Sequence, residues 1–140
     1  MSNLPYLDDQ TFVKQFEDFS LDTAHFNHNG HLRIAWSYLN QGCTLENIDK
    51  ICIGILRYAD HLGAHDKYHH TLSYTLALII AQRLIDHPVN SWEAFVDKNP
   101  DITNSALEVV QGYFSFDLFE HPTAKNQLIK ADLAPLNYLQ

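Results

Sequence analysis

Apolar residues recur at intervals of three and four along most of the chain, as they do on the buried face of α-helices. The first run predicts a helix over 8–19, which Asp8 or Asp9 can cap. Two longer runs predict helices over 30–41 and 45–62. The helix over 45–62 is apolar on more than one side, so we expect other helices to surround it.

A fourth helix is predicted over 68–86, between Gly63, which ends the third helix, and the His87-Pro88 pair. Shorter helices are predicted over 91–98, 103–114 and 122–130, and the tail after them is expected to be irregular. No run alternates between apolar and polar residues as a strand does. The sequence therefore predicts an all-α fold, a single domain over residues 1–140 built as a bundle of five to seven helices.

Composition and charge narrow the possible functions. The chain is 46% hydrophobic and 19% charged, which is typical of globular proteins. Its formal net charge is −8 and its basic residues are scattered, which argues against binding to nucleic acid. The acidic N-terminus does not resemble a signal peptide, and the longest apolar run is too short to span a bilayer. We therefore expect no membrane association and a cytoplasmic location.

Histidines are the main candidates for chemistry. Four of the chain's nine histidines fall within 61–70, between the two most apolar predicted helices, and three more lie near the start of the second helix. The first of these groups is His61, His65, His69 and His70, and the second is His25, His28 and His31. Both groups lie at predicted helix ends, where a bundle opens to solvent.

One interpretation is a transition-metal site. His28 and His31 are three residues apart and share a helix face, and His69 could join them from the fourth helix. His70 is the preferred fourth ligand, ahead of His61, His65, Asp60 and Asp66. Imidazole ligands suit zinc, so the predicted metal site is a Zn²⁺ site. An enzyme built on it would carry out metal-assisted hydrolysis or proton transfer.

A second interpretation needs no metal. His69 falls in the first turn of a helix, where the dipole disfavours imidazolium, and the same helix end could hold a carboxylate or phosphate. Lys67, Tyr68 and Arg33 are then the candidate ligand-binding residues, although Arg33 could instead pair with a carboxylate such as Asp60. This interpretation predicts a non-enzymatic small-anion-binding or regulatory module, and the aromatic segment 112–119 suggests a homodimer. A third makes most of the histidines surface or capping residues.

Two motifs carry a resemblance to a known family. The first is F-x-H-x-x-H-x-R-x-A-W, with Phe26, His28, His31, Arg33, Ala35 and Trp36, and the second is K-Y-H-E-T, with Lys67, Tyr68, His69, His70 and Thr71. With an N-P-D turn at 99–101, these motifs resemble a family of small helical bacterial proteins of no established activity. The resemblance implies a site made by both motifs and implies no reaction. His70 stands where the family usually has glutamate.

Overall fold

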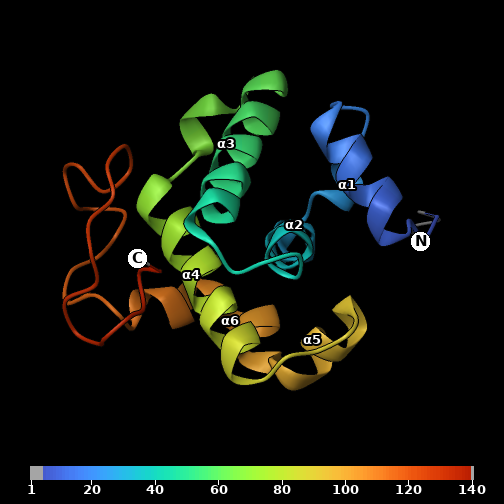
Figure 1. Ribbon diagram of the computed structural model, residues 1–140. Coiled ribbons are helices and arrows are strands. Elements are labelled where there is room, and N and C mark those ends of the chain that lie inside the picture. The colour runs from blue at the N-terminus through green and yellow to red at the C-terminus, as the bar shows by residue number, and fades with distance from the viewer. Residues whose placement is uncertain (1–4, 140) are drawn as a thin grey trace.

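Helix α2 (His28–Leu39) lies at the centre of the computed structural model, which describes residues 5–139, and it contacts the five other α-helices (Figure 1). Around it stand α1 (Asp9–Glu17), α3 (Leu45–His61), α4 (His70–Asp86), α5 (Trp92–Lys98) and α6 (Pro100–Gln111). Two 3-10 turns, η1 (Thr23–His25) and η2 (His65–Lys67), precede α2 and α4. No strand occurs within residues 5–139, so the predicted all-α bundle of five to seven helices is confirmed.

The helix that others surround is α2 rather than α3, and this corrects the prediction. Eight of the twelve residues of α2 are buried, including its one charged residue, Arg33. Helix α3 buries one face and leaves Ile53 56% exposed on another. The count of apolar residues in α3 overstated its burial, whereas the near absence of charge along α2 was the better signal.

Local capping sets the helix starts that shape the site. Asn27 caps α2, since its side-chain oxygen accepts a hydrogen bond of 2.9 Å from the Gly30 amide. A β-carbon on Gly30 would lie 2.1 Å from the carbonyl oxygen of His25, so only glycine lets η1 approach α2 so closely. Helix α2 therefore starts at His28, two residues before the predicted start. As predicted, Asp8 caps α1.

The predicted helix over 122–130 is wrong. Residues 112–139 contain no helix and run beside α3 and α4 (Figure 1, orange to red). The backbone of this segment forms isolated turns, such as the one closed by the Gln127 amide on the Thr123 carbonyl at 3.0 Å, and it also bonds to α4. The carbonyls of Lys125 and Ala124 accept hydrogen bonds from the amides of His70 and Thr71, the first two residues of α4, at 2.8 and 3.2 Å.

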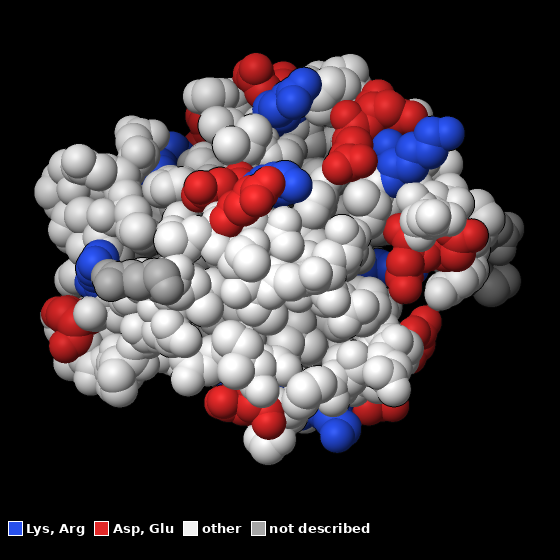
Figure 2. Space-filling view, viewed as in Figure 1, with Lys and Arg blue, Asp and Glu red and all other residues white. Residues whose placement is uncertain are grey.

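The face of the molecule seen in Figure 2 carries acidic and basic side chains across its upper part and along its edge, and an uncharged area in its centre. Within the described part of the chain, no helix is long and apolar enough to cross a membrane. The predicted cytoplasmic location stays a prediction.

Candidate functional site

Four helices enclose a mostly apolar pocket of about 370 Å³. Its walls come from α2, α3, α4 and α6, with one residue, Phe119, from the segment after α6. The apolar lining residues include Phe26, Ile51, Leu72, Leu76, Ala106 and Phe119. The polar lining residues are few: Asn27, His28, His31 and Ser73. We call this space the histidine pocket. A concave apolar space with a few converging polar groups is the usual form of a small-molecule site.

His31 is the polar group whose state in this pocket is best defined. Its Nδ1 lies 3.0 Å from the carbonyl oxygen of Asn27 and must donate to it, so Nδ1 carries the proton. Burial lowers the pKa of His31, and the neighbouring His28 lowers it further. A neutral ring with its proton on Nδ1 has a lone pair on Nε2. No partner for Nε2 is found among residues 5–139, and Nε2 is not sealed from solvent.

The ring of His31 is held against Phe26. The two ring centroids are 4.0 Å apart, and Phe26 in turn packs on Tyr58 at 4.4 Å and on Phe16 at 5.7 Å. Tyr58 is fully buried, and its hydroxyl donates to the carbonyl of Leu21 at 2.7 Å. This aromatic cluster fixes the orientation of the His31 ring, so its Nε2 is a positioned hydrogen-bond acceptor.

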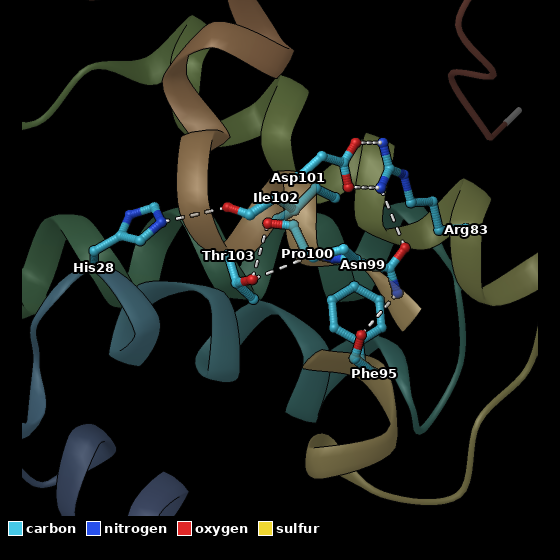
Figure 3. Close-up of polar contacts among 8 residues, drawn as sticks. All are labelled: His28, Arg83, Phe95, Asn99, Pro100, Asp101, Ile102 and Thr103. Atoms are coloured by element: carbon cyan, nitrogen blue, oxygen red, sulfur yellow. Dashed lines mark hydrogen bonds and ion pairs between the residues drawn. The ribbon is translucent and has the colours of Figure 1, made fainter. Parts of the chain in front are cut away.

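His28 lies at the exposed rim of the same pocket. Its Nε2 is 3.4 Å from the carbonyl oxygen of Ile102 in α6, a long hydrogen bond (Figure 3). Helix α6 is kinked at Ser105, whose backbone is not helical, between that carbonyl and the pocket residues Ala106 and Leu107. The weak contact and the exposed position leave His28 able to turn towards a ligand.

The start of α6 is clamped to α4 by the N-P-D residues. Arg83 of α4 donates two hydrogen bonds, of 2.7 and 2.8 Å, to the Asp101 carboxylate and a third, of 3.2 Å, to Asn99 (Figure 3). This bidentate pair raises the pKa of Arg83 and lowers that of Asp101. Pro100 occupies the first turn of α6. The N-P-D turn therefore positions α6 as a wall of the histidine pocket, but none of its three residues lines that pocket.

His69 is the N-cap of α4, and hydrogen bonds occupy both of its ring nitrogens. The amide of Leu72 donates to its Nδ1 at 3.1 Å, and its Nε2 donates to the carbonyl of Leu118 at 3.1 Å. The side chain is 6% exposed and meets the ring of Phe119 edge-on. The sequence placed His69 in the first turn as a ligand or base, but its ring instead joins α4 to the C-terminal segment.

His70 points away from the histidine pocket. It lines a separate, smaller pocket of about 250 Å³, which shares no lining residue with the first. Its Nδ1 lies 2.8 Å from the hydroxyl of Tyr68, and burial lowers the pKa of His70. Burial also raises the pKa of Tyr68 well above its usual value, and that of the nearby Cys52 to about 11. Both groups therefore keep their protons at neutral pH, so Cys52 is not an activated thiolate.

Arg33 and Lys67, the predicted ligand-binding cations, lie outside both pockets. Arg33 donates to the carbonyl of Leu7 at 2.7 Å and to the carboxylate of Asp9 at 2.8 Å, and its guanidinium lies over the ring of Phe12. Its partner is thus Asp9 and not Asp60, and it holds α1 against α2. Lys67 is exposed on η2.

The start of α4 offers no anion site of the kind predicted. The first two amides of α4 are used by the carbonyls of the C-terminal segment and the third by His69. Because these amides already donate to groups of the protein, an anion would have to displace those acceptors.

The predicted zinc site is not assembled. Within residues 5–139, no three His, Cys, Asp or Glu side chains lie together as metal ligands would. His28 and His31 do share one pocket, as their spacing predicted, but His69 is bonded at both nitrogens and His70 faces another pocket. Zinc binding stays a prediction, for which the described residues offer no preformed ligand set.

Sequence reasoning missed the apolar side of the site. The aromatic segment 112–119 suggested a dimer interface. In the structure Phe114 and Leu118 of this segment are buried in the core. Phe119 is 58% exposed and lines the pocket. Ser73 also lines the pocket, and no motif in the sequence marked it. The homodimer stays a prediction.

Comparison of the chain with protein-family models, with curated proteins and with solved structures finds no match in any of the three. The likeness to a family of small helical bacterial proteins therefore stays a prediction.

Proposed function

We propose that the protein binds a small, neutral, mostly apolar molecule in the histidine pocket. The observation that carries the proposal is the His31 ring, which lines an apolar pocket, is fixed by Asn27 and Phe26, and has an Nε2 without a partner among the described residues. The volume of about 370 Å³ falls in the range of small-ligand sites, roughly 300 to 1,000 Å³.

The lining decides the chemistry of the ligand. No lysine or arginine lines the pocket, so it lacks a permanent positive charge for a carboxylate or phosphate. A neutral ligand therefore fits this pocket better than the small anion that the sequence suggested. Nε2 of His31 accepts hydrogen bonds, so the ligand should present a hydroxyl or N–H to it and place its apolar body against α3, α4 and α6.

The proposal is binding without a chemical step. A neutral histidine can act as a general base, but catalysis also needs a reacting partner held near it. Ser73 and His28 are the other candidates in the pocket, and no hydrogen bond joins either of them to His31 in the described structure.

Calorimetric titration at pH 7.5 with 4-ethylphenol and with 4-ethylanisole tests the proposal. In the second probe a methyl group replaces the hydroxyl proton, so it cannot donate a hydrogen bond. We expect one saturable site and about tenfold weaker binding of the anisole, because it leaves the ring nitrogen unpaired. His31→Phe, which keeps the packing on Phe26, should reduce the affinity for the phenol to that for the anisole.

Variants that fill the pocket give the matched control. Ala77→Leu on α4 and Ala106→Leu on α6 enlarge lining side chains and should abolish binding of both probes, whereas Ala94→Leu on α5, outside the pocket, should not. His87→Phe is the control for His31→Phe. Absence of saturable binding, or equal binding by Ala77→Leu and the parent protein with both folded by circular dichroism, would contradict the proposal.

A further inference from the structure

A groove of about 530 Å³ lies between α1 and α3, on a different face of α3 from the one that lines the histidine pocket. One face of α3 forms a wall, through Lys50, Ile53, Gly54 and Arg57, which are spaced by three and four residues. The C-terminal half of α1 and the end of α2 supply the rest. We call it the α1–α3 groove.

The floor of the groove is aromatic and closely packed. Phe16 lies against Gly54, where an added β-carbon would come within 2.8 Å of its ring. Glycine at this position lets the ring of Phe16 approach the α3 backbone, and Phe16 is buried beneath the groove at 2% exposure. Ile53, which is 56% exposed, extends the apolar surface along the wall.

Phe19 borders the groove in an unusual backbone conformation. Its φ is +66°, in the left-handed region where a residue following a helix is usually glycine. There its ring stacks on His61, with centroids 4.8 Å apart and planes 11° apart, and the guanidinium carbon of Arg57 is 5.7 Å from its centroid. A disfavoured conformation thus places a flat aromatic surface beside a cation.

The charges lining the groove favour an anion in spite of the net charge of −8. No carboxylate lies within ion-pairing distance of Arg57 among residues 5–139, and Lys50 makes only an exposed contact of 3.4 Å with Glu46. The one acidic lining residue, Glu17, is held by the hydroxyl of Tyr38. Two cations two helical turns apart therefore flank an aromatic floor (Figure 2 shows charges of both signs over α1 and α3).

We propose that the α1–α3 groove is a second ligand site, specific for a planar aromatic carboxylate. The rings would lie against Phe19 and Ile53, and the carboxylate would pair with Arg57, while Lys50 adds positive charge to the groove. A guanidinium can bind a carboxylate through two parallel hydrogen bonds, which gives direction as well as affinity. This site is independent of the one in the histidine pocket.

The test uses 2-naphthoate, with 2-naphthalenemethanol as the uncharged probe of the same rings, followed by amide chemical-shift titration of the protein. We expect saturable chemical-shift changes over α3 and the end of α1. The alcohol should bind about tenfold more weakly than the naphthoate. Arg57→Gln should weaken naphthoate binding about tenfold, and raising the salt concentration should weaken it further.

Two controls keep the result specific. Lys67→Gln removes the same charge from an exposed site outside the groove and should leave naphthoate binding unchanged. Ala77→Leu closes the histidine pocket and should also leave it unchanged. The inference is overturned if naphthoate does not bind, if Arg57→Gln binds it as the parent does, or if Ala77→Leu abolishes its binding.

Discussion

His31 and His69 show how a hydrogen bond at one ring nitrogen decides what the other can do. In His31 the Nδ1–H donates to a backbone carbonyl, so Nε2 has no proton and is left as a hydrogen-bond acceptor. In His69 a backbone amide occupies Nδ1 and a carbonyl takes the Nε2 proton, so the ring has nothing left for a ligand or metal. The spacing of histidines in the sequence could not separate these roles, because both depend on backbone partners brought near by the fold.

Removal of the His69 ring should therefore reduce stability. His69→Ala loses the cap of α4 and leaves the Leu118 carbonyl without its donor, which we expect to cost about 1 to 3 kcal/mol of unfolding free energy in urea. His69→Asn retains a good cap and should recover part of the loss. An alanine variant as stable as the parent protein would show that neither hydrogen bond matters.

At the scale of elements, the periodic helices were predictable and the contacts between segments were not. Helices α1, α3 and α4 follow from runs of apolar residues with Asp8, Thr44 and Gly63 near their ends. The segment 122–130 carries a helical signal from Pro122, but its carbonyls are used by α4. A partner more than 50 residues away overrides local propensity, and the sequence alone does not reveal it.

Two threonines of α4 test this contact. The Thr71 hydroxyl donates to the carbonyl of Gln127 at 2.8 Å and accepts from the amide of Ile129 at 3.1 Å, whereas the buried Thr75 hydroxyl, one turn later, has no partner among residues 5–139. Thr71→Val should lower the unfolding free energy by about 1 to 3 kcal/mol, and the isosteric Thr75→Val should leave it unchanged or raise it. Equal effects of the two substitutions would contradict the account.

At the scale of the whole molecule, the fold divides the predicted histidine site into separate places. The first motif delivers His28 and His31 to one pocket, and the second delivers His69 to a helix cap and His70 to another pocket. Helices α2 and α4 pack against each other, but no residue of the second motif lines the histidine pocket. Which face of α4 each histidine takes depends on where that helix begins, and the predicted start at residue 68 was two residues early.

The pH dependence of stability follows from the buried histidines. The pKa values of His31 and His70 are lowered in the folded state, so between those values and about 6.5 the unfolded chain binds more protons. Stability should therefore fall as the pH is lowered from 7.5 through 6.5 to 5. Urea denaturation should show a smaller loss in His31→Gln and His70→Gln, whereas His87→Gln should behave as the parent does. A loss of the same size in all the variants would contradict this origin.

Long-range proton–nitrogen NMR of the imidazole rings decides the role of His31, because it reports which nitrogen carries the proton. At pH 7.5 we expect His31 to be neutral and protonated at Nδ1, and His69 to carry its proton on Nε2 while Nδ1 accepts from the Leu72 amide. Addition of 4-ethylphenol should move the Nε2 signal of His31 and leave both signals of His69 in place. A His31 protonated at Nε2, or an Nε2 signal that does not respond to the probe, would contradict the assignment of the histidine pocket as the binding site.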